Sequence, residues 1–221
     1  MTDCLLSRRD MLALAGSGAL MTAFPHTVRA GDGLVFDVYR KGARIGAHTI
    51  RFSTAGAGKL LVASELDLAV KVAFITAYRY HQVGEDVWDN DTLVATRIET
   101  DDDGVRTSVV VEARDSVLAV TGPNGAYTTA LGAMTDLSFW NEAITRGRPL
   151  IDSQSGDLID IQVQPSTLET IEVRGRMVEA ARFPMAASRG RSGTVWYDAE
   201  GDLVQAEVIT RGETLSYVLA G

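Results

Sequence analysis

The sequence predicts a mainly β protein, in which an antiparallel curved sheet of about ten to twelve strands closes into a barrel or half-barrel beside one short helix. Three observations lead to this fold class. Apolar residues recur at every second position along much of the chain, which is the periodicity of a strand with one buried face. Clusters of Gly, Asp, Asn and Pro separate these stretches at hairpin spacing. Only one segment has a helical pattern.

The longest alternation covers residues 60–74. Charged and small residues such as Lys59, Glu65 and Asp67 take one parity, and apolar residues take the other. A straight strand of this length would span roughly 45–50 Å, so we expect it to bend or to belong to a coiled sheet. The apolar parity comprises Leu60, Val62, Leu66, Leu68, Val70, Val72 and Phe74.

Shorter alternations predict further strands in both halves of the chain. They cover residues 34–39, 108–113, 159–164, 204–209 and 215–219. Turn residues occur between such stretches at 101–104, 122–125, 198–201 and 211–213. Each of these four segments contains glycine next to polar residues or proline, which is typical of tight turns between antiparallel strands.

Residues 136–144 are expected to form the short helix, with Asp136 or Ser138 as the N-cap. Its apolar stripe comprises Phe139, Trp140, Ala143 and Ile144. A helix beside a curved sheet buries such a stripe either as a structural plug or as a lid over a ligand site. We favour the plug, because buried aromatic residues are more often part of a core.

The first 30 residues have the pattern of a twin-arginine export signal. Arg8 and Arg9 precede a short apolar run, residues 11–21, which is about half the length needed to span a bilayer as a helix. A small-residue processing site ends at Ala30, so we expect cleavage there and a periplasmic product without a transmembrane anchor. The chain is therefore expected to comprise a signal at 1–30 and a single β-rich domain at 31–221.

Charge and cysteine content exclude several classes of function. The chain has 21 Lys and Arg against 29 Asp and Glu, a net charge of −8, which argues against a nucleic-acid partner. The single cysteine, Cys4, lies in the predicted signal. The mature protein is therefore expected to have no disulfide, cysteine nucleophile or thiolate metal site.

The sequence contains only incomplete matches to metal and cofactor motifs. Residues 101–104 resemble a calcium loop, but Val110 stands where the bidentate glutamate is required. Residues 56–60 resemble part of a phosphate loop but lack its first glycine and its hydroxyl. His48 and His81 lack metal-ligand spacing and are interpreted as ordinary strand residues. No cofactor, metal site or catalytic residue is predicted.

The most unusual patch is Tyr78-Arg79-Tyr80-His81, followed by Trp88. On a strand the two tyrosines share one face, and Arg79 and His81 share the other. Aromatic rings beside charged groups suit the mouth of a site for an amphipathic ligand, although tyrosines are also ordinary strand formers. The candidate ligand-binding residues are Tyr78, Arg79, Tyr80, His81, Trp88, Trp140 and Trp196.

The chain resembles a family of exported bacterial proteins known only as a domain of unknown function. The resemblance covers nearly all of residues 34–219. It is carried by residues 39–42, 46–49, 70–72, 78–80, 85–88, 93, 100–104, 140–141, 152–156 and 196–201. The family implies no activity and no catalytic residue. A more distant likeness to periplasmic half-barrel proteins that carry lipids or lipoproteins concerns architecture alone.

Three functions of different classes remain open. The first is a non-enzymatic protein that holds an amphipathic or lipidic molecule, or part of another envelope protein, in a concave sheet. The second is a scaffold subunit recognised through an exposed sheet edge. The third is a hydrolase or isomerase that uses His81, Arg79 and a carboxylate, either Glu85 or Asp152.

Overall fold

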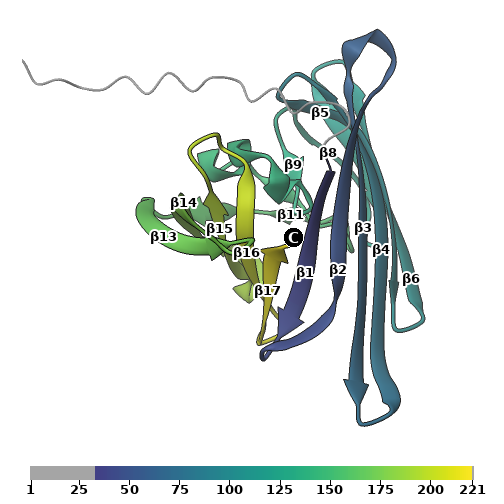
Figure 1. Ribbon diagram of the computed structural model, residues 1–221. Coiled ribbons are helices and arrows are strands. Elements are labelled where there is room, and N and C mark those ends of the chain that lie inside the picture. The colour runs from purple at the N-terminus through teal and green to yellow at the C-terminus, as the bar shows by residue number, and fades with distance from the viewer. Residues whose placement is uncertain (1–32, 221) are drawn as a thin grey trace, which may run out of the picture.

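One antiparallel sheet of 14 strands organises the computed structural model, which describes residues 33–220 apart from the side chains of Val72 and Arg189 (Figure 1). The mainly β prediction is confirmed. The predicted signal at 1–30 and its cleavage site lie outside the described residues. Within 33–220, no helix is long and apolar enough to cross a membrane.

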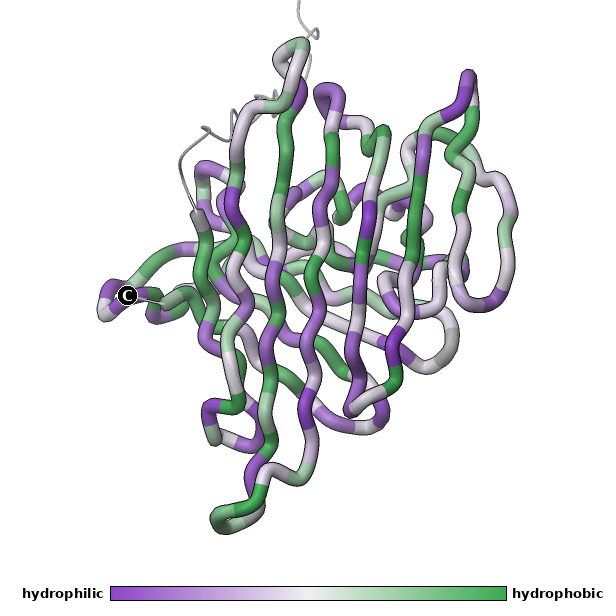
Figure 2. The backbone as a smooth tube through the Cα atoms, turned by 90° about the vertical axis from the view of Figure 1, so that its right-hand side faces the viewer, coloured by the Kyte–Doolittle hydropathy of each residue, from purple (hydrophilic) through white to green (hydrophobic). Residues whose placement is uncertain are grey.

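The first arm of this sheet is a meander of eight strands. They are β1 (Gly33–Arg40), β2 (Ala43–Thr54), β3 (Leu60–Val72), β4 (Ile75–Asp89), β5 (Thr92–Asp102), β6 (Val105–Arg114), β7 (Val117–Gly122) and β8 (Gly125–Ala130). A 3-10 turn, η1 (Gly56–Gly58), connects β2 to β3. The alternation predicted over 60–74 produces β3, but Phe74 lies in the turn after that strand. Figure 2 shows hydrophilic and hydrophobic residues alternating along these strands.

The second arm is formed by the C-terminal part of the chain. Its elements are β12 (Ile161–Val163), β13 (Thr167–Val173), β14 (Arg176–Ala187), η4 (Ser188–Gly190), β15 (Ser192–Tyr197), β16 (Leu203–Thr210) and β17 (Glu213–Leu219). The arms meet where β1 pairs with β17, with Phe36 opposite Leu219 and Arg40 opposite Leu215. The first and last strands of the described chain are therefore neighbours in the centre of the sheet.

The segment between the arms, residues 131–160, packs against the concave face. It contains β9 (Met134–Thr135), η2 (Ser138–Trp140), η3 (Glu142–Arg146), β10 (Leu150–Ile151) and β11 (Leu158–Ile159). The three short strands form a second sheet in the order β11-β10-β9. The Phe139 ring lies 6.5 Å from Phe36 of β1 and 5.6 Å from Tyr217 of β17, measured between ring centroids.

Closure into a complete barrel is not observed: in the described residues β8 at one end of the sheet pairs only with β7, and no ladder joins it to the other end. The inner segment lies between the two ends instead. The hydroxyl of Tyr127 in β8 donates to the Gly156 carbonyl at 2.8 Å, and Ser188 N at the other end donates to Asp160 O at 2.9 Å. A Cβ at Gly122 would lie 2.6 Å from Ser155 O, so this approach requires glycine. The strand count also exceeds our prediction, since the main sheet alone has 14 strands in the described residues.

The predicted helix at 136–144 is wrong. The segment forms two separate 3-10 turns, η2 and η3, because Asn141 between them is extended, with φ −101° and ψ 114°. The side chain of Asn141 caps η3 by accepting from Ala143 N at 2.9 Å. Neither residue predicted as the N-cap has that role. Ser138 lies inside η2, and the side chain of Asp136 accepts a hydrogen bond from Ser153 N instead. The four stripe residues are nonetheless all buried.

Trp140 lies in the main core. Its ring centroid is 5.1 Å from Phe52 and 5.6 Å from Trp88, and its side chain is 7% exposed. We predict that Trp140→Ala will destabilise the protein by about 3–5 kcal/mol, because the segment would lose its largest contact with the sheet. Thermal and urea unfolding measure this loss. An unshifted transition would contradict the plug interpretation and support a lid.

His48 of β2 is buried against Phe139, with ring centroids 5.3 Å apart, and neither of its nitrogens has a hydrogen-bond partner. This burial lowers the pKa of His48 from 6.5 to about 4. A depressed imidazole pKa makes the folded state bind fewer protons, so its stabilising contribution is complete above pH 6.5 and is lost as the pH falls towards 4.

We predict that His48→Leu will remove this acid sensitivity. As the pH falls from about 6.5 to 4, the unfolding free energy of the variant should rise relative to that of the wild type, by up to about 3 kcal/mol. Urea unfolding of both proteins at several pH values in this interval measures the difference. A difference that does not vary with pH would contradict a buried neutral imidazole.

Candidate functional site

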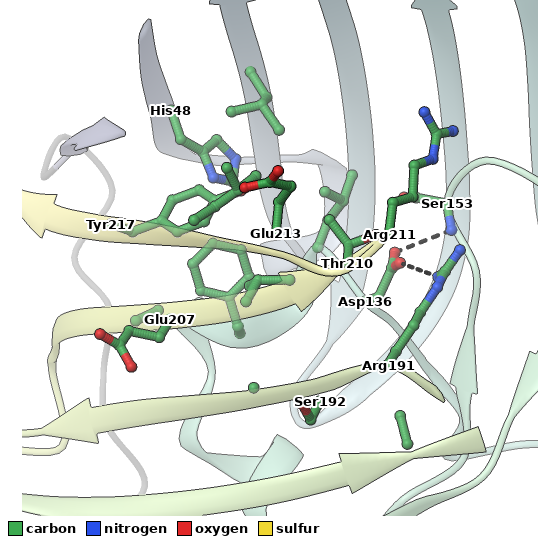
Figure 3. A pocket seen from close by; sticks show the side chains of 18 of the residues that line it. His48, Asp136, Ser153, Arg191, Ser192, Glu207, Thr210, Arg211, Glu213 and Tyr217 are labelled. Carbon is green, nitrogen blue, oxygen red and sulfur yellow. Dashed lines mark hydrogen bonds and ion pairs between the residues drawn. The ribbon is translucent and has the colours of Figure 1, made fainter. Parts of the chain in front are cut away.

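The concave face contains a cavity of about 470 Å³ beside the inner segment (Figure 3). Its wall is largely apolar because the inward parity of the strands carries aliphatic and aromatic side chains. The apolar lining comprises Ile45, Leu66, Leu68, Val70, Leu137, Phe139, Ile144, Leu150, Ile159, Ile161, Met185, Ala187, Val195, Ala206, Val208, Leu215 and Tyr217. Strands of both arms and the inner segment therefore build the cavity together.

A polar rim lies at the end of the cavity near the turns after β1 and β16. Arg40 donates to Glu213 at 2.7 Å, and Arg211 donates to Asp102 at 2.6 Å. Tyr78 also donates to Asp102, at 2.6 Å. The pKa of Tyr78 is raised to about 12, mainly by burial and secondly by the Asp102 carboxylate, so the Tyr78 hydroxyl remains a neutral donor. The two rim arginines are thus each neutralised by a carboxylate.

A second polar group lies between the inner segment and β15. Asp136 accepts a hydrogen bond from Ser153 N at 3.0 Å, and Arg191 Nη1 lies 3.6 Å from Asp136 Oδ2 (Figure 3). The same Arg191 nitrogen also forms an ion pair with buried Asp152. Asp152 Oδ1 accepts from Gln154 N at 2.8 Å. Burial, and then the nearby charge of Asp152, raises the pKa of Asp136 to about 6. One arginine thus holds two carboxylates.

Tyr80 and Gln82 connect this group to the sheet. Gln154 Nε2 donates to the Tyr80 hydroxyl at 3.1 Å, and Gln82 Nε2 donates to Ser153 Oγ at 3.1 Å. Burial raises the pKa of Tyr80, so its hydroxyl stays protonated. These hydrogen bonds join the polar groups of the inner segment to the inward face of β4.

The predicted ligand residues separate into three groups. Tyr78 and Tyr80 line the cavity. Arg79 and His81 alternate with them on β4 and are exposed on the opposite face. Trp88 and Trp140 are buried in the core, and neither lines the cavity.

Trp196 lies in a separate cluster with Val173, Ala180 and Val204. Its indole N–H donates to Glu169 at 3.1 Å, and the Arg182 guanidinium lies 5.7 Å from the ring centroid. It faces β13 and β14, away from the cavity lining.

The residues proposed for catalysis do not converge. Arg79, His81 and Glu85 are exposed on the outer face of β4, whereas Asp152 is buried beside Arg191. A general base must come within hydrogen-bond reach of its partner group. The sheet separates Asp152 from the other three residues, and Glu85 lies four residues from His81 on the same strand, about 13 Å at roughly 3.3 Å per residue. In the described residues, no group of three or more His, Cys, Asp or Glu side chains is arranged to hold a metal ion.

Sequence reasoning missed Asp136, Arg191 and the rim arginines Arg40 and Arg211. Their positions depend on the pairing of β1 with β17 and on the path of the inner segment, which strand periodicity does not reveal. The inward parity of β16 and β17 was visible in the sequence as the alternations at 204–209 and 215–219.

A solved structure supports the architecture. The chain is similar to the crystal structure of a β-barrel-like protein of the domain of unknown function DUF1849 from Brucella abortus, with a TM-score of 0.60 and 10% sequence identity. The match covers 85% of this chain and 94% of that chain. At this identity the similarity concerns the fold alone. No curated protein matches the chain.

The expected membership of an uncharacterised family is confirmed by a family model that covers most of the described domain. Residues 36–220 match the domain of unknown function DUF6134, and the chain therefore belongs to the DUF6134 family.

Proposed function

We propose that this protein binds one amphipathic molecule in the concave cavity and does not convert it chemically. The observation that carries the proposal is the cavity itself, about 470 Å³ in volume, with an apolar wall and polar groups at its rim. Volumes of this order are typical of sites for small molecules. The apolar wall suits a hydrocarbon chain, and the rim suits a polar end group.

The charges of the rim favour a neutral or zwitterionic end group over an anionic one. Arg40, Arg191 and Arg211 line the cavity, and each pairs with a carboxylate. An anionic headgroup would meet arginines whose charge a carboxylate already offsets, and it would be repelled at close range by that carboxylate. A hydroxyl, ester or amide can bind beside the pairs without that cost.

The test uses adjacent residues of β16 that differ in their exposure and in their contact with the cavity. Val208 lines the cavity, whereas Ile209 does not line it and is 40% exposed. We predict that Val208→Trp will lower the affinity for a long-chain fluorescent monoacylglycerol analogue at least tenfold by filling the cavity, and that Ile209→Trp will not. Fluorescence titration measures both affinities, and thermal melts verify folding.

The same titration with a fluorescent fatty acid tests the end group. Weaker binding of the acid than of its glycerol ester is expected, because the arginines are already paired. Failure of the wild type to bind either probe, or equal binding by both tryptophan variants, would argue against ligand binding in this cavity.

We also propose that the protein acts in the periplasm after twin-arginine export. The support is the pattern of residues 1–30, with Arg8 and Arg9 ahead of a short apolar run. Replacement of both arginines by lysine keeps the charge and should leave the protein in the cytoplasm, as measured by cell fractionation. Undiminished periplasmic protein in the double variant would contradict this proposal.

A further inference from the structure

The turn between β3 and β4 differs from the other tight turns of the sheet. Its two residues are Ala73 and Phe74, and Ala73 has a φ of +54°, a conformation that favours glycine or asparagine. In residues 33–220, the other two-residue hairpin turns all contain polar residues or proline. They are Lys41-Gly42, Asn90-Asp91, Asp103-Gly104, Asp115-Ser116, Pro123-Asn124, Arg174-Gly175 and Arg211-Gly212. Turn chemistry alone does not explain an apolar pair at this position.

The side chains at this turn make almost no contact with the protein. Phe74 is 102% exposed relative to an extended reference, and the adjacent Ile75 is 73% exposed. Figures 1 and 2 show the β3–β4 hairpin extending beyond its neighbours at one end of the sheet. We call Ala73, Phe74 and Ile75 the apolar tip.

The apolar tip lies just beyond the rim of the cavity. Val70 and Tyr78 are paired across the hairpin, and both line the cavity. Only Lys71 and Val72 on β3, and Thr76 and Ala77 on β4, separate these two lining residues from the tip. The exposed rim residue Arg211 binds Asp102, and Asp102 in turn accepts from Tyr78. Any surface that the apolar tip contacts would therefore lie opposite the polar rim of the cavity.

We propose that the apolar tip inserts into the surface of a phospholipid bilayer and that the cavity exchanges its ligand with that bilayer. The second clause rests on the function proposed above, whereas the first does not. Binding at a lipid interface scales with the apolar area that is buried, and two large apolar side chains on a narrow projection can enter it without burying polar groups of the sheet. They present far less than the roughly 800 Å² that each partner contributes to a stable protein interface.

The charge of the protein determines which bilayer the tip fits. Lys71 and Arg79 are exposed on the hairpin, and at the neighbouring turn Asp101 and Asp103 offset Arg106, so no cluster of unpaired basic residues surrounds the tip. The whole chain carries −8. Attraction to anionic lipid is therefore not the driving force. Binding should occur on zwitterionic phosphatidylcholine vesicles and should change little with salt, since apolar burial is insensitive to screening.

Insertion is measured by tryptophan fluorescence with phosphatidylcholine vesicles whose acyl chains are brominated, since bromine quenches indoles that enter the hydrocarbon. Phe74→Trp places a reporter at the tip, and Leu168→Trp places one on β13, where Leu168 is 70% exposed. After subtraction of the wild-type signal, we expect vesicle-dependent quenching for Phe74→Trp and none for Leu168→Trp. Equal quenching of both variants, or of neither, would overturn the proposal.

Loading of the cavity is tested separately. Phe74→Ser/Ile75→Ser should slow uptake of the monoacylglycerol probe from vesicles at least tenfold, while its affinity for probe added from solution remains that of the wild type. The control is Leu168→Ser/Met177→Ser, which changes two residues that are 70% and 67% exposed on the β13–β14 hairpin.

The two proposals can fail separately. If no protein takes up probe from any source but Phe74→Trp is quenched, the cavity function is wrong and the membrane contact stands. If probe binds from solution and the tip variant loads from vesicles at the wild-type rate, the exchange role of the tip is wrong.

Discussion

The pairing of β1 with β17 is the constraint on which the rest of the structure depends. The first arm is a meander of sequence-local hairpins, and so is the second from β13 to β17, with β12 added beside β14. The single ladder between β1 and β17 joins the two arms into one sheet. The main core draws on both sides of it, with Phe36 from β1 and Tyr217 from β17 packed around Phe139. Because these strands are far apart in the sequence, the cavity cannot exist until this long-range ladder has formed.

The cavity is the part of the concave face that the inner segment leaves unfilled. At one end, Trp140 packs on Phe52 and Trp88, and no space remains. Towards the β16–β17 turn, the residues of the second arm that line the cavity include two small ones, Gly193 and Ala206. A void among apolar side chains costs stability. Its persistence beside a hydrogen-bonded polar network supports a function for the space.

Periodicity predicted the β class, the long β3 strand and the shared face of Tyr78 and Tyr80, because alternation depends only on local geometry. It did not indicate which of the two faces of that strand points inward. It could not predict the open edge of the sheet, which depends on contacts between residues far apart, such as Tyr127 with Gly156. The helix prediction failed for a local reason, the extended backbone at Asn141. The three tryptophans were predicted as ligand-binding residues from their residue type, but Trp88 is wholly buried in the core.

The buried titratable groups of the concave face oppose one another in their dependence on pH. Burial lowers the pKa of His48 to about 4, so its contribution to stability is lost as the pH falls below 6.5. Burial raises the pKa values of Asp86 and Asp136 to about 6, so the stability linked to their protonation is present below pH 3.8 and is lost as the pH rises through 6.

Between about pH 4 and 6 the two effects have opposite signs, and the histidine offsets part of the change caused by the carboxyls. Thr96 donates to Asp86, and Arg191 lies beside Asp136, which reduces the cost of ionising these carboxyls near neutral pH. The net dependence of stability on pH in this range is therefore smaller than that of the two carboxyls alone.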